Sequence, residues 1–537
     1  DLQKVDLTKM NYPLTLNLIL EHVRRIHGDK YVHTLMPTGK IHTYDYTTFC
    51  ERVDKLANAI NNLGLAYGDR VATFASNTYQ HLELLYAIPL AGGVIHPINI
   101  RLTSKQQAEI VQQADDKLFF VDDAYLDKFS ALQEKIRSAM SVHFNTDKTY
   151  HQRQSSMEYE GWITRKHKAF NPNIQDENTA LALCYTSGTT GEPKGILYSH
   201  RSVLLHTFAV NQADVFGITE SDVVLPLVPI YHALAWGIPY AAMFVGADIV
   251  LHGRGLDVVV DIISETGVTI SAGVPTIWRK LLPELLRRKQ DVTSLQRIIV
   301  GGEAMPSTLI DAYEKELGVE VRQAWGMTEM SPTGTFSTLR REHLHLPDKQ
   351  KSRIKSMQGR PIPGVQIRLA SEDEYDLPWD GETIGEIQVR GIWTAGDYYG
   401  TESSQEHFTE DGWLRTGDLA TINREGYMHI VDRAKALIKS GGESISTSAL
   451  EAVLIQHPLV KDATVVGIPD EQWGERPLAA VALSESTDED ISKLLSKHLA
   501  DEFPKFWIPD HFIVIDEIPK NSVGKTDKDA IMKYITK

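Results

Sequence analysis

Short apolar runs alternate with helical patterns through roughly the first 300 residues, and this alternation constrains the fold more than any other feature. The runs "DRVATFAS" (69–76), "LFFVDD" (118–123) and "VTISAGVP" (268–275) are bounded by turn residues, whereas "YTTFCERVDKLANAINNLG" (46–64) has apolar residues at helical spacing and ends at a glycine. Strands that alternate with helices predict a parallel sheet covered by helices. Ligands of such sheets bind where loops gather at the carboxyl ends of the strands.

The pattern changes after residue 361. The segments "VQIRLA", "GEIQVRG" and "GYMHIVDR" are alternating strands with glycine-rich turns, which are typical of a small β-rich subdomain. From "ISTSALEAVLIQHP" to "HFIVIDEIPK" the pattern predicts a compact α+β unit. A chain of 537 residues is too long for one core, so we expect an α/β protein with at least two domains and a boundary within "VDRAKALIK".

Composition excludes several classes of function. A net charge of −16 without long basic runs disfavours nucleic-acid binding. Two cysteines, Cys50 and Cys184, suggest a reducing compartment. The sequence contains no Cys/His cluster with the spacing of a structural zinc site, so such a site is not expected. Residues 223–247 lack charged side chains, but three prolines predict a strand, a turn and a core helix there instead of a membrane span. We expect a soluble cytoplasmic protein; the first residue is not Met, so a trimmed leader is left open.

The segment "YTSGTTGEPKG" (185–195) combines hydroxyl groups, glycines and Lys194. Glycines let the backbone approach a ligand, and hydroxyl and N–H groups can surround phosphate oxygens. The spacing differs from that of a P-loop, because Gly188 is followed by "TTGEPKG". The segment is either an exposed structural loop or a phosphate-binding loop of another class, and we favour the second interpretation.

Five further motifs follow in order: "GGEA" (301–304), "WGMTE" (325–329), "RTGDL" (415–419), "DRAKALIKSGGE" (432–443) and "PKNSVGK" (519–525). With the loop at 185–195, they resemble the signature motifs of the adenylate-forming superfamily, which includes acyl-CoA synthetases, beetle luciferases and peptide synthetase adenylation domains. "GLAYGDRVA" and "PINIRLT" extend the resemblance over nearly the whole chain.

The resemblance implies a reaction in two halves. A carboxylate attacks the α-phosphorus of ATP and forms an acyl-adenylate, and a thiol, usually that of coenzyme A, then displaces AMP. Since two anions meet, cations and oriented dipoles should dominate catalysis. The resemblance therefore implies ATP, Mg²⁺ and coenzyme A as a cosubstrate, together with a small-molecule carboxylate.

The resemblance also assigns residues to ATP. The phosphate loop would be Thr186, Ser187, Gly188, Thr189, Thr190, Gly191 and Lys194. The nucleoside would be held by Gly302, Glu303, Ala304, Trp325, Gly326, Met327, Asp418 and Arg433, with Trp325 in the place of the usual Tyr. Thr328 would bind the α-phosphate, and Glu329 with Thr186 would hold Mg²⁺. By itself, Asp418 is more typical of a turn, and only its place in the series of motifs assigns it to the nucleoside.

The last two motifs imply a moving C-terminal domain. Lys525 would bridge the attacking carboxylate and the α-phosphate, and Lys435 would be the hinge. Lys439, Gly441 and Gly442 would line the coenzyme A tunnel. The implied domains are 1–431, a hinge at 432–436, and a small mobile α+β domain at 437–537. The sequence has "KTDK" after the last motif, where many relatives have an aromatic residue.

The carboxylate is constrained by "IYHALAWG" (230–237). No Asp is available for a substrate ammonium, so amino-acid activation is disfavoured. His232 would lie near the acyl carboxylate, although such a histidine is also common in protein cores. Trp236 would either form an aromatic gate to the acyl tunnel or pack in the core. Val274, Pro275 and Trp278 would be further residues of an apolar acyl pocket.

The local patterns "SAGVPTIW", "VRQAWGMTEMSP" and "GIWTAGDYYG" most resemble bacterial medium- and long-chain fatty acyl-CoA synthetases. We therefore expect a fatty acid–CoA ligase that forms AMP. Alternatives are a ligase for short, branched or aryl acids, a luciferase-like enzyme, an enzyme that loads a carrier protein, or an inactive binding module. Glu329, Asp418 and Lys525 argue against the last. A homodimer is left open.

Overall fold

The computed structural model describes residues 10–136, 140–144, 156–164, 176–186, 193–253, 255–287, 289–371, 373, 375–400, 405–433, 438–440, 443–470, 473–503, 505–520 and 526–535. The chain forms two compact units. The first unit contains residues 1–366 and 390–406, and the second contains residues 367–389 and 407–537. The hinge at 432–436 and the domain bounds expected around it stay predictions.

A seven-stranded sheet lies in the first unit. Its order is β7 (Ser156–Glu158), β6 (Met140–Phe144), β5 (Leu118–Asp122), β3 (Arg70–Phe74), β4 (Val94–Pro97), β8 (Ala180–Tyr185) and β9 (Gly195–Ser199). All neighbours are parallel except β8 and β9, which are antiparallel. β3 and β5 are the predicted strands of "DRVATFAS" and "LFFVDD".

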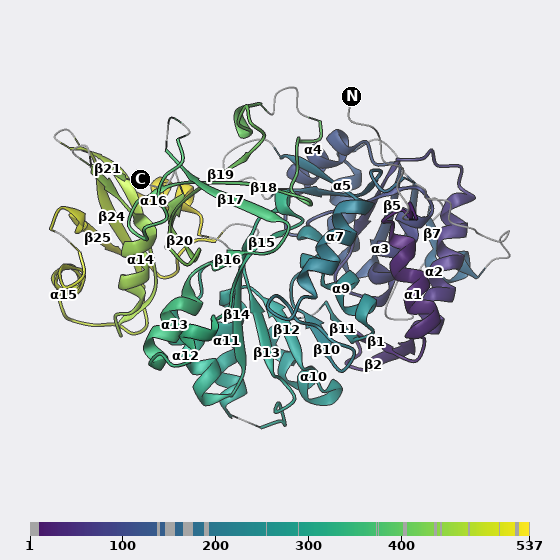
Figure 1. The fold of residues 1–537 in the computed structure, drawn as a ribbon, viewed down its shortest axis with the longest axis horizontal. Coiled ribbons are helices and arrows are strands. Elements are labelled where there is room, and N and C mark those ends of the chain that lie inside the picture. Colours follow the sequence, from purple (N-terminus) through teal and green to yellow (C-terminus); the bar gives the residue numbers. More distant parts are fainter. Residues whose placement is uncertain are drawn as a thin grey trace. The chain divides into compact units, whose positions relative to one another are not determined.

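A nine-stranded sheet forms the other half of this unit (Figure 1). Its order is β16 (Arg360–Pro361), β15 (Thr333–Ser337), β14 (Glu320–Gly326), β13 (Arg297–Val300), β12 (Ile270–Gly273), β10 (Val223–Pro226), β11 (Asp248–His252), β1 (Tyr31–Leu35) and β2 (Ile41–Asp45). Pairing is parallel from β14 to β1 and antiparallel at both ends. The predicted parallel sheets are confirmed.

The helices of the first unit cover these sheets. They are α1 (Leu16–Ile26), α2 (Tyr46–Asn61), α3 (Tyr79–Leu90), α4 (Ser104–Ala114), α5 (Leu126–Gln133), α6 (Tyr159–Ile163), α7 (His200–Val210), α8 (Ala233–Trp236), α9 (Ile238–Val245), α10 (Val259–Thr266), α11 (Pro275–Arg287), α12 (Ser307–Asp311) and α13 (Asp348–Ser356). Asp45 caps α2 by accepting from the backbone N–H of Thr48, and Ser199 and Ser202 form a capping box at α7.

Residues 223–247 form β10, a turn that contains α8, and the buried helix α9, as predicted. Within the described ranges, the structure contains no helix with the length and apolarity needed to cross a membrane. Both cysteines are buried and unpaired, and burial raises the pKa of each thiol to about 12.

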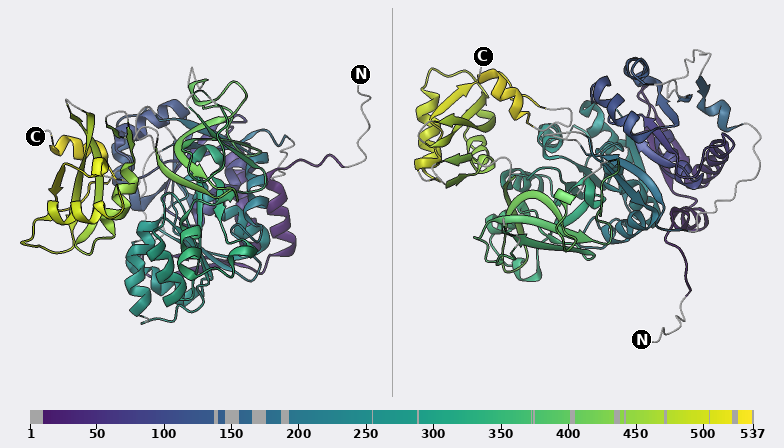
Figure 2. Two further views of the ribbon diagram at one scale, coloured as in Figure 1. Left: turned by 60° about the vertical axis from the view of Figure 1, so that its left-hand side comes forward. Right: turned by 90° about the horizontal axis from the view of Figure 1, so that it is seen from above.

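The second unit contains two smaller sheets. The first has the order β17 (Val365–Ala370), β18 (Gly385–Gly391), β19 (Leu414–Ile422) and β20 (Met428–Arg433). The other contains β22 (Glu443–Ile445), β21 (Ile438–Ser440), β24 (Gly474–Leu483), β23 (Val460–Asp470) and β25 (His511–Val514), with helices α14 (Thr447–Ile455), α15 (Ile491–Ala500) and α16 (Lys528–Ile535). Figure 2 shows the strands and helices of this second sheet together, drawn in yellow-green and yellow. The expected fold class, large N-terminal sheets with a β-rich part and a small α+β part, is confirmed.

Candidate functional site

The hairpin of β8 and β9 brings together the two ends of the predicted phosphate loop. Tyr185 and Gly195 are paired in the ladder, and the backbone N–H of Thr186 donates to the carbonyl oxygen of Lys194 at 2.9 Å. The loop therefore leaves the sheet at the carboxyl end of β8, where ligands of α/β proteins usually bind. Ser187, Gly188, Thr189, Thr190 and Gly191 lie outside the described residues.

Tyr398 connects this loop to the predicted metal-binding residue. The Nζ atom of Lys194 lies 5.3 Å from the centroid of the Tyr398 ring, and the hydroxyl of Tyr398 donates to Oε1 of Glu329 at 2.8 Å. Glu329 is only 6% exposed. Burial is the largest cause that raises the pKa of Tyr398, and the charge of the Glu329 carboxylate raises it further. The phenol of Tyr398 therefore keeps its proton. Tyr398 was not predicted as a site residue, and its one signal in the sequence is its place in the segment "GIWTAGDYYG" (391–400).

The "WGMTE" motif forms the end of β14 and the turn that follows it. A Cβ atom at Gly326 would lie 1.8 Å from the carbonyl oxygen of Pro332, so only glycine fits there. This close approach lets the N–H of Met327 donate to the same oxygen at 3.0 Å. Tyr198, on β9, donates its hydroxyl to the carbonyl oxygen of Thr328 at 2.6 Å. The turn is therefore held from both sides.

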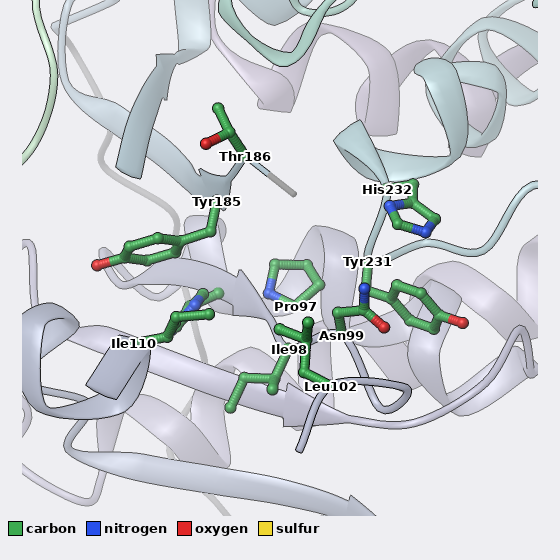
Figure 3. A pocket seen from close by; sticks show the side chains of 10 residues that line it. Pro97, Ile98, Asn99, Leu102, Ile110, Tyr185, Thr186, Tyr231 and His232 are labelled. Atoms are coloured by element: carbon green, nitrogen blue, oxygen red, sulfur yellow. The ribbon is translucent and has the colours of Figure 1, made fainter. Parts of the chain in front are cut away.

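A pocket lies between Thr186, which follows β8, and His232. Figure 3 shows Tyr185 and Thr186 on one side of it and Tyr231 and His232 on the other. The full lining is His96, Pro97, Ile98, Asn99, Leu102, Ile110, Tyr185, Thr186, Tyr231 and His232. Two predicted residues from distant parts of the chain, Thr186 and His232, thus share one pocket.

Asn77 holds the segment that leads to His232. Its amide nitrogen donates to the carbonyl oxygen of Val228 at 2.9 Å, and its amide oxygen accepts from the N–H of Ile230 at 2.9 Å. Asn77 follows β3 of the seven-stranded sheet, whereas Val228 and Ile230 follow β10 of the nine-stranded sheet. This buried amide therefore joins the carboxyl ends of the two sheets.

The helix α8 is a left-handed turn. The φ angles of Ala233, Leu234, Ala235 and Trp236 lie between 44° and 59°, and Gly237 continues the turn at 74°. For residues other than glycine, this conformation costs about 1–2 kcal/mol each. Such strain persists only where the surroundings enforce it, and it is often found near functional sites.

The left-handed turn places Trp236 over the "GGEA" segment. A Cβ atom at Gly301 would lie 3.2 Å from the Trp236 ring, and one at Gly302 would lie 3.2 Å from Cγ1 of Val274. Three of the residues predicted to contact the acyl group or the nucleoside, Trp236, Val274 and Gly302, thus lie along one stretch of the site. The carbonyl oxygen of Ala324 would lie 3.3 Å from a Cβ atom at Gly301. The next residue in the chain, Trp325, is only 7% exposed.

Other predicted residues lie elsewhere in the first unit. Trp278 is fully buried, donates from Nε1 to the carbonyl oxygen of Gly273 at 3.1 Å, and packs edge-on against Tyr313 in the core formed with α10 and α12. Pro275 is buried at the first position of α11. Glu303 and Ala304 are exposed.

In the second unit, Asp418 and Arg433 are cross-strand partners in β19 and β20. Asp418 is buried at 7% exposure, and its N–H donates to the hydroxyl oxygen of Thr416 at 3.1 Å. Lys439 lies in β21. The remaining predictions, Lys435, Gly441, Gly442 and Lys525, lie outside the described residues.

Comparison with known proteins agrees with this geometry. The family model "AMP-binding enzyme" matches residues 20–399, and "AMP-binding enzyme C-terminal domain" matches residues 449–525. The chain is 38% identical to 3-methylmercaptopropionyl-CoA ligase of Ruegeria lacuscaerulensis, over 97% of both chains. It is 38% identical to medium-chain-fatty-acid–CoA ligase of Ectopseudomonas oleovorans, over 97% of this chain and 96% of the relative. It is 39% identical to long-chain-fatty-acid–CoA ligase of Thermus thermophilus, over 98% of this chain and 96% of the relative.

The fold is also that of a solved structure, the anthranilate CoA ligase AuaEII in complex with anthranoyl-AMP. The TM-score is 0.85 at 22% identity, over 98% of both chains. Fold and site thus define an adenylate-forming enzyme. The chain belongs to the family of AMP-binding enzymes, as a ligase of the acyl-CoA synthetase type that binds ATP, and the resemblance seen in the sequence is confirmed.

Proposed function

We propose that this ligase converts a medium- or long-chain fatty acid, ATP and coenzyme A into an acyl-CoA, AMP and pyrophosphate. The observation that carries the proposal is the position of the Thr328–Glu329 turn. On one side it contacts Tyr398 and, through that ring, Lys194 of the phosphate loop. On the other side Tyr198 connects it to a small cavity between α7 and the left-handed turn at α8.

This arrangement suits the joining of a triphosphate and an acyl carboxylate. Ligand pockets are mostly apolar with a few placed polar groups, and Val203, Ala233 and Leu234 supply apolar walls here. Medium-chain and long-chain fatty acids are named for two relatives at 38% and 39% identity, which supports a fatty acid as the substrate. The name of another relative at 38% identity, 3-methylmercaptopropionyl-CoA ligase, supports a short acid as the second candidate.

In the first half-reaction, a carboxylate oxygen attacks the α-phosphorus, and the bond to pyrophosphate breaks with its electron pair on the departing oxygen. Residues 186–191 and Lys194 hold the β- and γ-phosphates, while the hydroxyl of Thr328 donates to the α-phosphate. Lys525 adds positive charge between the carboxylate and the phosphate. Fixed donors and cations of this kind stabilise charge without rearranging during the reaction.

Glu329 and Thr186 fit the proposed Mg²⁺ ion. In the described part of the chain, no group of three or more His, Cys, Asp or Glu side chains could hold a metal. Mg²⁺ is commonly bound by one or two carboxylates together with substrate phosphates, so a single buried carboxylate suits it. Tyr398 orients that carboxylate by a hydrogen bond to Oε1. When bound, the ion would neutralise phosphate charge.

The remaining predicted residues are assigned to the nucleoside of ATP and to the thiol of coenzyme A. Trp325 stacks on adenine beside Gly302, Glu303, Ala304, Gly326 and Met327, while Asp418 and Arg433 bind the ribose. His232 lies at the acyl carboxylate, where the thiol sulfur of coenzyme A attacks the acyl carbon and AMP leaves. Lys439, Gly441 and Gly442 line the thiol tunnel, and domain 437–537 turns about Lys435 between the half-reactions.

The test is CoA-dependent release of AMP from unbranched acids of two to eighteen carbons. We expect the highest kcat/KM with acids of medium or long chain, because two relatives at 38% and 39% identity are named for such acids. Glu329→Gln serves as the inactive control. Absence of AMP release with every acid would overturn the proposal, and an optimum at acetate or propionate would overturn its chain-length part.

A further inference from the structure

Tyr198 contacts the peptide group that joins the two residues assigned to the α-phosphate and to Mg²⁺. Its hydroxyl donates to the carbonyl oxygen of Thr328 at 2.6 Å, and this carbonyl belongs to the peptide bond between Thr328 and Glu329. Tyr198 is only 2% exposed and lies on β9. Because a peptide group is planar, the direction of its carbonyl restricts how the chain leaves Thr328 and enters Glu329. The bond therefore influences the directions of both side chains.

The turn that contains these two residues needs support from outside. It is a 3₁₀ turn of three residues, Thr328–Met330, and the hydrogen bonds of such turns have poor geometry. Among the described residues, the carbonyl oxygen of Thr328 also accepts from the N–H of Ser331, at 3.3 Å. The bond from Tyr198 is much shorter and is the stronger of the two. Without the hydroxyl of Tyr198, the carbonyl would keep only the long bond, so we expect the turn to shift.

Tyr198 also belongs to a closed circuit of hydrogen bonds around the turn. The N–H of Ala395 donates to the carbonyl oxygen of Glu329 at 2.7 Å, and the N–H of Tyr399 donates to that of Gly195 at 2.8 Å. Gly195 and Tyr198 lie on the same strand, β9. The circuit therefore runs from β9 to the turn, then to the segment that contains Ala395 and Tyr399, and back to β9.

The same strand follows the phosphate loop. Gly195 comes directly after Lys194 and pairs with Tyr185, the last residue of β8. Tyr198 thus connects the turn to the strand that carries one end of the loop. In adenylation, the loop and the turn would hold different parts of one triphosphate, so their spacing matters. Misplacement of a reacting group by about 1 Å can lower a rate by about a hundredfold.

Resting on the function proposed above, we propose that Tyr198 is a positioning residue for the first half-reaction. Its phenol takes no part in making or breaking bonds. It holds the peptide between Thr328 and Glu329 so that the first residue meets the α-phosphate while the second meets Mg²⁺. The spacing between the loop and the turn matters only while the triphosphate is whole. Acyl transfer from the adenylate to coenzyme A therefore depends little on Tyr198.

The experiment measures the two half-reactions separately in Tyr198→Phe, with the full chain and octanoate. We expect ATP–pyrophosphate exchange to fall by about ten- to hundredfold. Thioester formation from supplied octanoyl-adenylate and coenzyme A should stay within about twofold of wild type. Tyr313→Phe is the matched control, because its fully buried hydroxyl group also donates to a backbone carbonyl, that of Trp278, at 2.7 Å. This control should change neither half-reaction.

A double-mutant cycle tests whether Tyr198 acts through the turn. Thr328→Val keeps the shape of the side chain but removes its hydroxyl, so the orientation of position 328 then matters less. The loss of pyrophosphate exchange caused by Tyr198→Phe should be smaller in the Thr328→Val background than in wild type, by about threefold or more.

Three results would overturn the role of Tyr198. They are an equal loss in both half-reactions, which would indicate a merely structural role, a loss that Tyr313→Phe reproduces, and losses that simply multiply in the double variant. Unchanged exchange in Tyr198→Phe, in an enzyme whose wild type is active, likewise rejects only this role. Absence of exchange with every carboxylate in wild type overturns the proposed function itself.

Discussion

Tyr398 donates a hydrogen bond from its hydroxyl to the carboxylate of Glu329, at 2.8 Å, across 69 positions of the sequence. The bond is buried, since Glu329 is 6% and Tyr398 is 8% exposed. It fixes one carboxylate oxygen in a place where the same tyrosine ring contacts Lys194. The orientation of the proposed metal-binding group therefore depends on a residue outside the motif that contains it.

Tyr398→Phe should lower the rate of adenylation by about ten- to hundredfold, because a hydrogen bond to a charged group contributes about 1.5–3 kcal/mol. The loss should appear in ATP–pyrophosphate exchange and should be accompanied by a weaker response to Mg²⁺. Tyr399→Phe is the control, since the backbone N–H of Tyr399 keeps its bond to Gly195. Equal rates in the two variants would contradict this role for Tyr398.

Lys194→Met should raise the KM for ATP by about tenfold or more with little effect on the KM for the acid. The reason is the loss of a positive charge beside the phosphates in a partly buried site, where charge interactions are stronger than in water. Initial-rate kinetics with each substrate varied in turn would measure the effect. Lys315→Met, at the exposed surface of the first unit, should leave both constants unchanged. A parallel rise in both KM values would argue against phosphate binding.

Gly301→Ala should displace the Trp236 ring, because the new Cβ would lie 3.2 Å from it. We expect a change in the profile of kcat/KM against chain length, with little change in the KM for ATP. A Cβ atom at Gly396 meets nothing within 4 Å, so Gly396→Ala provides a control for the loss of a glycine. An unchanged chain-length profile would place Trp236 outside the acyl site.

Acid should destabilise the fold through three buried histidines. Burial lowers the pKa of His81 and of His200 to about 4 and that of His206 to about 3, from 6.5 in the unfolded chain. Below pH 6.5 the unfolded chain binds protons that the folded chain does not, so stability is present above 6.5 and falls as the pH decreases. Each histidine contributes up to about 1.4 kcal/mol per pH unit.

The thermal midpoint should accordingly be lower at pH 5.5 than at pH 7.5. His200→Asn can still accept the hydrogen bond that Nδ1 receives from the N–H of Leu16, but it cannot be protonated, so its decrease should be smaller. A decrease of the same size in wild type and variant would show that other groups control the acid response.

Lys525→Ala should lower the rate of adenylation by a factor of about a hundred or more. The variant should still form the thioester from supplied acyl-adenylate. This prediction follows from the "PKNSVGK" motif, because Lys525 lies outside the described residues. Separate assays of pyrophosphate exchange and of acyl transfer to coenzyme A would check it. Loss of both half-reactions to the same extent would count against a role confined to the first.

Strands and helices were predictable because the pattern that specifies them is local. The apolar runs of β3, β5, β11 and β12 and the helical spacing of α2 are recognisable within a few residues. The motifs that carry the family resemblance are equally local, so the order in which they occur along the chain was enough to identify the class of enzyme.

Contacts across the site could not be predicted in this way. The hydroxyl of Tyr198 meets Thr328 across 130 positions, and His206 meets Thr333 across 127 positions. Each pair depends on how β9 and α7 pack against the end of β14 and the start of β15, which no short sequence pattern specifies. For the same reason, "SAGVPTIW" could not distinguish a Trp278 in the core from one in the acyl pocket.

The sequence by itself therefore determined the parallel sheets and, through its ordered motifs, the class of reaction, because periodicity and short motifs act over a few residues. Tertiary structure alone decided the left-handed turn at 233–236, since four non-glycine residues adopt positive φ only under the constraint of their surroundings. It also decided that Tyr398 orients Glu329 and that His206 contacts Thr333. Both depend on burial, which a residue acquires only from the packing of distant segments.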